Sequence, residues 1–270
     1  MAEQKIVLVT GASSGIGAAI SSRLTRDGHK VFGTGRNASG VTNDGVTLMA
    51  LDVRSDDSVR ACVAGVLSKA GRLDVLVNSA GFLLAGAIEE ATIQQAQDEF
   101  DTNFFGIVRM VKGVLPTMRK QRSGLVVNMS SLAGIVPLPF WGFYNASKFA
   151  VEGYSESLRI ELKPFGIHVA MVEPGAIKTP LYAHPTTTPM PEYSPWRDRA
   201  LKSMKHFESI APGPDAVAAV VSNIVRNKSP KLRNGLTREG TILPILRRLL
   251  PDDVFANALR SNFRLDKEGS

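Results

Sequence analysis

The sequence predicts an α/β protein in which a doubly wound parallel sheet lies between two layers of helices. Short apolar runs alternate with helical patterns along most of the chain, which is typical of a parallel sheet with helices on both faces. The runs end in glycine or small polar residues, and ligands bind at this carboxyl end of parallel strands. Strands are expected at residues 5–10, 29–34, 46–51, 73–77, 124–129 and 167–172.

Length and composition fit one domain spanning residues 1–270. The chain is 44% hydrophobic, which allows a large core, and it has no apolar run of about 18 residues that could cross a membrane. Met1 is followed almost at once by the first strand, which leaves no room for a signal peptide, and the single cysteine, Cys62, excludes an internal disulfide. A cytoplasmic protein is therefore expected. Cys62 and four scattered histidines offer no spacing typical of metal ligands, so no metal is expected.

Basic charge gathers in the C-terminal part of the chain. The net charge is +7, from 32 Lys and Arg against 25 Asp and Glu. From Arg197 onward there are 14 basic and 8 acidic residues, which leaves a net of +1 for the preceding 196 residues. A solvated basic face explains this at least as well as contact with an anionic membrane surface or an acidic protein. No nucleic-acid partner is expected.

A glycine-rich turn joins the first expected strand to the first expected helix. Gly11, Gly15 and Gly17 follow that strand in the spacing Gly-x-x-x-Gly-x-Gly, and the helix is expected to stop at Gly28. The missing side chains let the backbone approach a pyrophosphate, while the helix N-terminus offers free N–H groups. The turn therefore predicts dinucleotide binding, although its spacing differs from the commoner fingerprint.

Arg36 follows the second expected strand, where a dinucleotide site reads the adenosine ribose. An NAD site usually places Asp or Glu here for the 2′-hydroxyl, whereas an arginine accommodates the 2′-phosphate of NADP. No acid stands at this strand end, so Arg36, with the hydroxyl of Ser14 across the turn, favours NADP(H). The alternative is an arginine that lies in solvent on a loop.

Small and polar residues also close the third and fourth strands. Asp52-Val53 follows the third, and Asn78-Ser79-Ala80-Gly81 follows the fourth. Because the carboxyl ends of parallel strands meet at one edge of a sheet, these turns are expected to lie beside the glycine-rich turn. Ser55 is expected to cap the helix between the two strands.

Asn103 lies inside a helix that is expected to begin after Thr92 and to run to about Met118. Asn is a poor helix former, so its position needs a structural reason. A kink that frees a backbone carbonyl is one explanation, and a plain buried hydrogen bond is the other.

Tyr144 and Lys148 lie four residues apart in the first turn and a half of a further expected helix. Residues at this spacing share a helix face, with Cβ atoms roughly 5–6 Å apart. A neighbouring ammonium favours the phenolate, so the pKa of Tyr144 is expected to fall toward working pH. Such a tyrosine can give a proton to a carbonyl oxygen or take one from an alcohol. The same pair also occurs on ordinary helix surfaces.

The C-terminal part of the chain is expected to cover the site. Residues 180–214 are rich in Pro, Thr, Met and aromatic residues with little regular pattern, which is typical of a lid or binding loop. A helix is expected at 215–226 and an edge strand at 231–236, before a C-terminal extension of residues 240–270 whose last residues fray. Its apolar and basic segment, 242–250, is expected to cover the pocket mouth, touch an anionic membrane or pack against a neighbouring subunit.

Six motifs in order resemble those of the short-chain dehydrogenase/reductase family over nearly the whole chain. The resemblance implies one Rossmann-type domain and an NADP(H)-dependent oxidoreductase acting on CH–OH groups. Ser79 departs from the family, which usually has a second Asn there, so local hydrogen bonding is put in doubt. The motifs are the turn from Thr10 to Gly17, Asn78-x-Ala80-Gly81, the helix residue Asn103, Ser131 thirteen residues before Tyr144, Tyr144-x-x-x-Lys148, and Pro174-Gly175-x-x-x-Thr179.

The resemblance also implies roles for single residues. Tyr144 is the general acid in reduction, and Lys148 lowers its pKa and holds the nicotinamide ribose. Ser131, selected over Ser130 by its offset from Tyr144, hydrogen-bonds the substrate oxygen, and Asn103 anchors a water in a proton relay. Cofactor contacts are expected at Gly11, Ser13, Ser14, Gly15, Ile16, Gly17, Arg36, Asp52, Val53, Asn78, Ala80, Gly81, Tyr144, Lys148, Pro174, Gly175, Ile177 and Thr179.

Within the family, residues 138–140, 147–153, 164–166 and 243–247 resemble 17β-hydroxysteroid and retinol dehydrogenases. This implies a bulky hydrophobic ketone, aldehyde or alcohol as substrate (a steroid, retinoid or lipid) and a homodimer or homotetramer. A lining of large apolar and amphipathic side chains favours the same substrate class. Substrate contacts are expected at Ser131, Leu132, Leu138, Tyr144, Tyr182, Tyr193 and Trp196, and further walls at Leu83, Leu84, Val136, Phe140, Trp141 and Met190.

Two other functions are considered. A β-ketoacyl thioester could be delivered by acidic acyl carrier protein, for which five basic residues offer a docking face. An NADP-binding redox sensor would need no tuned phenol, so an intact set of catalytic residues argues against it. The docking residues are Arg109, Lys112, Arg119, Lys120 and Arg122.

Overall fold

The computed structural model describes residues 3–179 and 183–266 of the chain. Every strand expected from the sequence is confirmed, including the edge strand near residue 233. Two further short pieces form a small parallel sheet beside the main one, and one two-residue strand was not predicted. The strands are β1 (Ile6–Val9), β2 (Lys30–Gly35), β3 (Gly40–Val41), β4 (Thr47–Ala50), β5 (Val75–Asn78), β6 (Leu83–Ala85), β7 (Gly124–Met129), β8 (Ile167–Glu173), β9 (Ala183–Pro185) and β10 (Arg233–Gly235).

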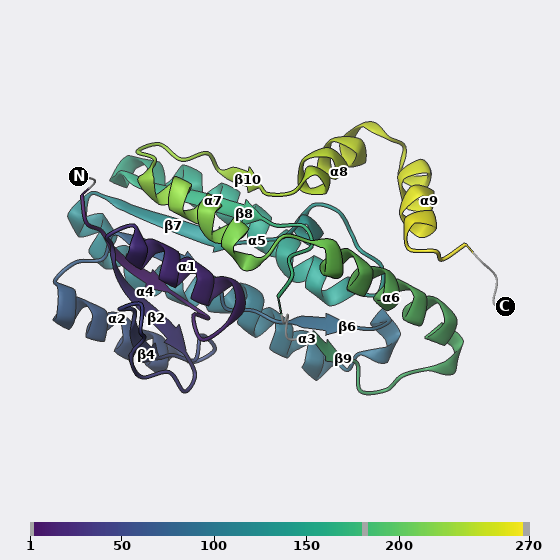
Figure 1. Ribbon diagram of the computed structural model, residues 1–270, viewed down its shortest axis with the longest axis horizontal. Coiled ribbons are helices and arrows are strands. Elements are labelled where there is room, and N and C mark those ends of the chain that lie inside the picture. Colours follow the sequence, from purple (N-terminus) through teal and green to yellow (C-terminus); the bar gives the residue numbers. More distant parts are fainter. Residues whose placement is uncertain (1–2, 180–182, 267–270) are drawn as a thin grey trace.

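Helices cover both faces of the main sheet (Figure 1). The order of its strands is β10-β8-β7-β5-β1-β2-β4-β3, and every described neighbour pair is parallel except β3 and β4. This is a Rossmann-type α/β/α fold, and its strand order reverses between β1 and β5. The helices are α1 (Gly15–Arg26), α2 (Asp56–Ala70), α3 (Ile93–Phe100), α4 (Gly106–Gln121), α5 (Gly142–Leu162), α6 (Ser194–Ile210), α7 (Pro214–Arg226), α8 (Arg238–Leu249) and α9 (Asp252–Asn262).

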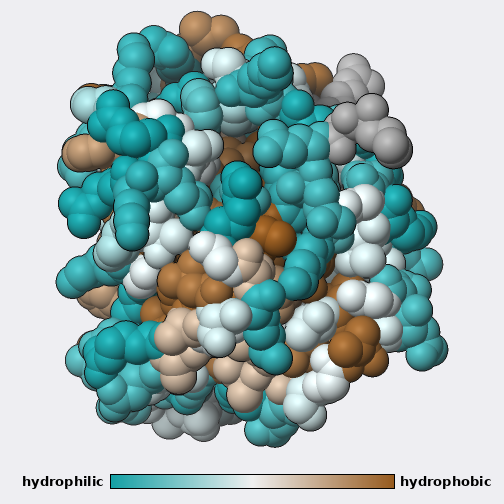
Figure 2. Space-filling model, turned by 90° about the vertical axis from the view of Figure 1, so that its left-hand side faces the viewer, coloured by the Kyte–Doolittle hydropathy of each residue, from teal (hydrophilic) through white to brown (hydrophobic). Residues whose placement is uncertain are grey.

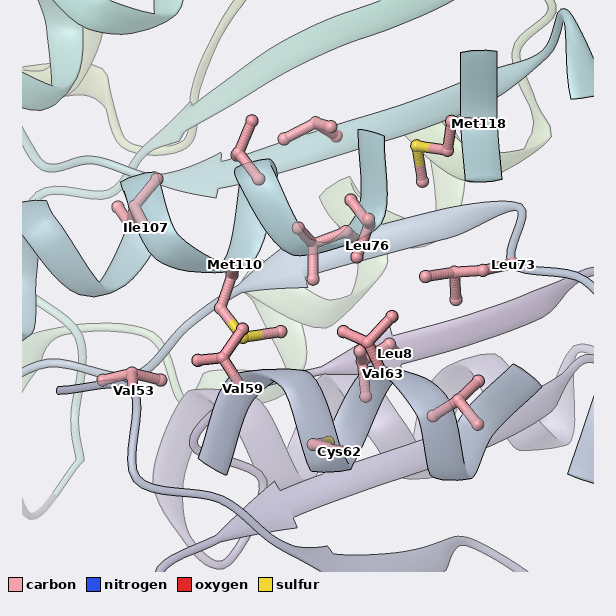
Figure 3. Close-up of a cluster of buried hydrophobic side chains, with 14 of the residues drawn as sticks. Leu8, Val53, Val59, Cys62, Val63, Leu73, Leu76, Ile107, Met110 and Met118 are labelled. Carbon is pink, nitrogen blue, oxygen red and sulfur yellow. The ribbon is translucent and has the colours of Figure 1, made fainter. Parts of the chain in front are cut away.

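Two apolar clusters hold the three layers together. On one face Leu8 and Leu76 pack against α2, α4 and α5, where Cys62 and Met110 face them (Figure 3). On the other face Val7 and its strand neighbours pack against α1 and α7. Successive strand residues point to opposite faces, which is why Val7 and Leu8 enter different clusters. Cys62 is thus a core residue, and burial raises the pKa of its thiol to about 11.

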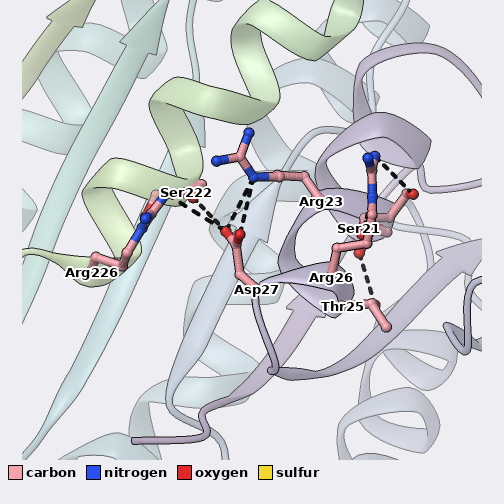
Figure 4. Close-up of polar contacts among 8 residues, drawn as sticks. Ser21, Arg23, Thr25, Arg26, Asp27, Ser222 and Arg226 are labelled. Atoms are coloured by element: carbon pink, nitrogen blue, oxygen red, sulfur yellow. Dashed lines mark hydrogen bonds and ion pairs between the residues drawn. The ribbon is translucent and has the colours of Figure 1, made fainter. Parts of the chain in front are cut away.

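A polar contact also joins α1 to α7 (Figure 4). Asp27, which ends α1, accepts from the Ser222 hydroxyl at 2.5 Å and pairs with Arg23 at 3.1 Å. Burial opposes ionisation of Asp27, yet the bonds from Ser222 and Arg23 together hold its pKa below the usual value. The carboxylate therefore stays charged and ties the two helices on that face.

The expected helix through Asn103 is interrupted by a π turn. Between α3 and α4, Asp101–Phe105 is π-helical, and the N–H of Gly106 donates to the carbonyl of Asp101. Thr92 caps α3, since its hydroxyl accepts from the N–H of Gln95 at 3.1 Å. The π turn breaks the regular α-helical pattern at Asn103, and the Asn103 side chain also forms buried hydrogen bonds, so both explanations considered from the sequence find support. π turns often occur at functional sites.

One expectation for the C-terminal part is wrong. Residues 180–214 were expected to have little regular structure, but they contain the 17-residue helix α6. Its apolar residues recur at helical spacing: Ala200 and Met204 are buried against the body of the protein, and Phe207 is partly buried there. The C-terminal extension forms α9, and the last four residues, which were expected to fray, lie outside the described residues.

The end of the molecule opposite α8 and α9 carries mostly hydrophilic residues, with hydrophobic residues visible between them (Figure 2). Within residues 3–179 and 183–266, none of the helices combines the length and the apolar character that crossing a bilayer requires.

Candidate active site

A cavity of about 990 Å³ opens at the carboxyl ends of the parallel strands. It lies where the strand order reverses, which is the usual ligand site of such a sheet. Nearly all residues expected to contact the cofactor line it, and these are Gly11, Ser13, Ser14, Gly15, Ile16, Gly17, Arg36, Asp52, Val53, Ala80, Gly81, Tyr144, Lys148, Pro174, Gly175, Ile177 and Thr179. Asn78 and Asn103 are not part of this lining; both are buried behind it.

The glycine-rich turn has no room for side chains. Gly11 has a φ of +68°, and a Cβ on it would lie 2.8 Å from the Cα of Ala80. A Cβ on Gly17 would lie 2.2 Å from the carbonyl oxygen of Gly11. The turn can therefore fold closely against the N-terminus of α1, which leaves backbone N–H groups facing the cavity for a pyrophosphate.

Thr10 joins the glycine-rich turn to the turn after β5. Its hydroxyl oxygen accepts from the N–H of Ser79 at 2.9 Å and from the N–H of Ala80 at 3.0 Å. These bonds use only the backbone of Ser79, so the serine at this position leaves the turn intact. This role of the Thr10 side chain was not predicted from the sequence.

Two arginines stand at the ribose end of the cavity. Arg36 is exposed, and among the described residues it has no ion pair within 4.0 Å, whereas Arg54 pairs with Asp52 at 3.5 Å. The end of β2 approaches the turn closely, since a Cβ on Gly35 would lie 3.2 Å from the Cβ of Ser13. A 2′-phosphate here would meet Arg36 and the Ser13 hydroxyl. Arg54, which was not predicted from the sequence, would be a second cation.

Tyr144 and Lys148 lie side by side at the centre of the cavity wall. Both are less than one-tenth exposed, and the Lys148 Nζ lies 5.6 Å from the centroid of the Tyr144 ring. The ammonium donates to the carbonyl of Met129 at 2.9 Å, and the ring edge of Tyr144 meets Trp141 at a centroid distance of 5.8 Å. These contacts fix both side chains against the end of β7.

The pKa of Tyr144 departs from the expected direction. Burial raises it to about 12, a hydrogen bond with Ser131 opposes the rise, and the charge of Glu99 adds to it. Burial also lowers the pKa of Lys148 to about 8, although the charges of Glu99 and Glu152 act to raise it. Desolvation thus sets the direction of the shift, so the phenol stays protonated at neutral pH and is suited to donating a proton.

Ser131 and Asn103 are both held by the backbone around them. Ser131 precedes a 3₁₀ turn, and its hydroxyl accepts from the N–H of Ala133 at 3.1 Å. The Asn103 amide accepts from the N–H of Phe82 at 3.0 Å and donates to that residue's carbonyl at 2.8 Å. It also donates to the Ser147 hydroxyl at 3.3 Å, so the side chain of Asn103 is fully engaged beside α5.

The other end of the cavity is mainly apolar. Leu132 and Leu138 line it as expected, but Tyr193 and Trp196 do not; Trp196 is 40% exposed, and the Tyr193 hydroxyl donates to Glu89. Tyr182 lies outside the described residues. The unexpected lining comes from α6, α8 and α9, and helical spacing in those segments could have found it. These residues are Met204, Phe207, Glu208, Ile210, Leu243, Leu259, Asn262 and Phe263.

The family model for short chain dehydrogenases matches residues 5–189 of this chain. A curated relative, the 3-ketodihydrosphingosine reductase of Bacteroides thetaiotaomicron, is 40% identical over 267 residues, covering 96% of this chain and 97% of that protein. Human 17-beta-hydroxysteroid dehydrogenase type 1 is 33% identical, covering 96% of this chain and 85% of that protein. The resemblance stated from the sequence is therefore confirmed.

A solved structure agrees with these relatives. A short-chain dehydrogenase from Streptomyces avermitilis superimposes with a TM-score of 0.82 at 32% identity, covering 99% of this chain and 100% of that chain. The likeness thus includes α6, α8 and α9 as well as the sheet.

Proposed function

Because this chain belongs to the short-chain dehydrogenase family, we propose that it reduces a bulky apolar ketone or aldehyde with NADPH. The chain is an oxidoreductase of that family with an NAD(P)(H) cofactor. The finer proposal rests on the position of Tyr144, which is buried beside Ser131 and Lys148 where the glycine-lined part of the cavity meets its apolar part.

The residues present fit a dinucleotide. The crowded glycines would hold the pyrophosphate, Arg36 and Ser13 a 2′-phosphate, and Lys148 the nicotinamide ribose. When bound, the cofactor supplies the hydride. The protein's part is to orient the ring against the substrate carbon and to manage the proton.

Negative charge develops on the substrate oxygen during reduction, and two donors would meet it there. Tyr144 would give its proton to this oxygen, while the Ser131 hydroxyl would hold the oxygen in place. The Lys148 ammonium donates one N–H to the Met129 carbonyl and keeps further N–H donors. Lys148 would therefore return a proton toward the phenol. A phenol with a pKa of about 12 favours reduction at neutral pH, whereas alcohol oxidation needs the phenolate and should quicken as pH rises.

The apolar end of the cavity supports a hydrophobic substrate. Met204 and Phe207 from α6 and Phe263 after α9 face the catalytic wall, and few charges are placed to hold a carboxylate or phosphate. The relative from Bacteroides thetaiotaomicron is named for a lipid-like ketone, which agrees with this lining. Residues 183–214 and the C-terminal extension would act together as the cover of this pocket.

Two surfaces support the expected partners. An apolar groove between α3 and α5, lined by Phe100, Phe105 and Phe143, fits a second copy of the chain, and sedimentation would give the assembly's mass.

Helix α8 places Leu243 in the cavity while Ile245 and Leu249 are more than half exposed beside basic residues. That arrangement fits an anionic membrane surface, and co-sedimentation with anionic but not neutral vesicles would test it.

Loss of NADPH absorbance with a long-chain apolar ketone is the experiment that tests the function. We expect turnover by the wild type, and a loss of about a hundredfold to ten-thousandfold in kcat for Tyr144→Phe, with NADPH affinity nearly unchanged because the ring still packs. Lys148→Ala should lower both rate and cofactor affinity. No turnover with any ketone would favour the redox sensor, and inhibition by acyl carrier protein would favour the thioester reductase.

A further inference from the structure

Glu99 is a buried carboxyl group that the mechanism above does not use. It lies on α3 with no exposed surface. Its Oε1 accepts from the N–H of Leu84 at 3.0 Å, but its Oε2 has no hydrogen-bond partner among the described residues. An unpartnered buried carboxyl oxygen is costly, so it calls for an explanation.

Glu99 lies in the same buried region as the catalytic Lys148. Helix α3 packs against α5, and the charge of Glu99 acts on both Lys148 and Tyr144. Asn103 follows four residues later at the π turn, and its amide reaches Ser147, the neighbour of Lys148. Among the described residues, Glu99 makes no ion pair within 4.0 Å, so it acts on Lys148 through its charge and not through an ion pair.

Few other charges face Glu99. Strand β6, which covers it, contains only Leu83, Leu84 and Ala85. On its own helix Asp98 is bonded to Gln94, and in the π turn Asp101 is paired with Arg109. Lys148 and the Tyr144 phenol are thus the titratable groups on α5 that face this carboxyl.

We propose that Glu99 is the proton reservoir of the active site, which returns a proton through one bridging water to Lys148 after each reduction. The proposal rests on the proposed ketone reduction, and it makes Glu99 a positioning residue that never touches the substrate. Burial raises the pKa of Glu99 to about 7, although the hydrogen bond from the Leu84 N–H and the charge of Lys148 act to lower it. The group can therefore hold and release a proton near neutral pH.

Each reduction consumes one proton, and solvent replaces it at the end of the relay. Tyr144 protonates the substrate oxygen and is reprotonated from the Lys148 ammonium. The protonated Glu99 gives its proton to the bridging water, which passes one to the neutral amine of Lys148. Bulk water then reprotonates the Glu99 carboxylate between turnovers, since Asp98 and Thr102 on the same helical stretch line the cavity.

Glu99→Gln tests the reservoir, because the amide keeps the shape and an acceptor for Leu84 but cannot titrate. The matched control is Glu161→Gln, the same chemical change on the exposed surface of α5. Rates of ketone reduction with saturating NADPH are measured from about pH 5.5 to 9. In the wild type and the control, we expect kcat to fall as pH rises through about 7, because Glu99 loses its proton. In Glu99→Gln this fall should vanish, and kcat at about pH 6 should be at least about tenfold lower with an unchanged KM for NADPH.

A pH profile of unchanged shape in Glu99→Gln would overturn the proposal, as would a uniform loss at every pH together with a lower Tm. If Glu99→Gln does not fold, Glu99→Asp decides: it keeps a carboxyl group and should keep the fall in rate near neutral pH. Infrared spectra separate this inference from the function, because they need no turnover. A protonated carboxyl band that Glu99→Gln lacks should disappear in the wild type between about pH 6 and 8 and shift to higher pH in Lys148→Met. Absence of that band would also overturn the proposal.

Discussion

The cofactor end of the cavity is walled largely by backbone, whereas the substrate end is walled by side chains. At the cofactor end, Gly11 and Gly17 let two turns approach so closely that a single Cβ would collide with a neighbouring backbone atom. At the substrate end, Met204 and Phe207 from α6 meet Phe263 from the other side. The backbone therefore sets the shape of the cofactor end. The shape of the substrate end depends on which side chains the helices carry.

The two ends also differ in what holds them. Thr10 bonds both turns of the cofactor end, close to the strands that carry them. The cover of the substrate end depends on Glu90, which is fully buried and binds the N–H of Met190 at 2.8 Å and the guanidinium of Arg197. Burial opposes the charge of Glu90, but these bonds and that of Ala87 keep its pKa below the usual value. The cover is thus fastened by contacts about a hundred residues apart in the chain.

Gly17→Ala should have the largest effect, and only at the cofactor end. Its Cβ would lie 2.2 Å from the Gly11 carbonyl, so the turn must open. We expect NADPH affinity to fall at least about a hundredfold, measured by cofactor fluorescence, because several bonds to the pyrophosphate are lost together. Gly153→Ala is the control, since its Cβ meets nothing within 4 Å and alanine favours a helix. Unchanged affinity in Gly17→Ala would mean that the turn does not hold the pyrophosphate.

Arg36→Ala should have the next largest effect. Charge-assisted bonds to a 2′-phosphate contribute about 1.5–3 kcal/mol each, so the wild type should prefer NADPH to NADH at least about tenfold in kcat/KM. The substitution should remove most of that preference without harming NADH use. Arg60→Ala, an exposed arginine of α2 outside the cavity lining, should leave it intact. Equal use of both cofactors by the wild type would show that Arg36 only faces solvent.

Met204→Ala should have the smallest effect, confined to the substrate end. Loss of this buried side chain should lower kcat/KM for a long apolar ketone by roughly 5–30-fold, about 1–2 kcal/mol, while a short ketone and NADPH are unaffected. Lys202→Ala, an exposed change on the same helix, serves as the control. An equal loss for short and long ketones would mean that Met204 stabilises the fold and does not bind the substrate chain.

The same contrast explains what could be predicted from the sequence. Turns built on glycine, and the Tyr144–Lys148 pair, depend on local spacing, so most residues that line this end of the cavity could be predicted. Tyr193 and Trp196 were placed in the pocket by their size alone, but the fold turns them elsewhere. Their place is taken by α6, α8 and α9 residues whose positions depend on packing between distant segments. The pKa of Tyr144 was misjudged for a related reason, because it is raised mainly by burial, which depends on packing between distant segments.

An apolar pocket that presents a ketone to Tyr144 in an NADPH site should select its substrate by chain length. The decisive measurement is kcat/KM across a homologous series of ketones of rising chain length, at saturating NADPH. Each buried methylene should contribute roughly 0.8 kcal/mol, so kcat/KM should rise about fourfold per carbon until the cavity is filled. A flat or falling series, with small polar ketones preferred, would mean that the apolar lining does not bind the substrate.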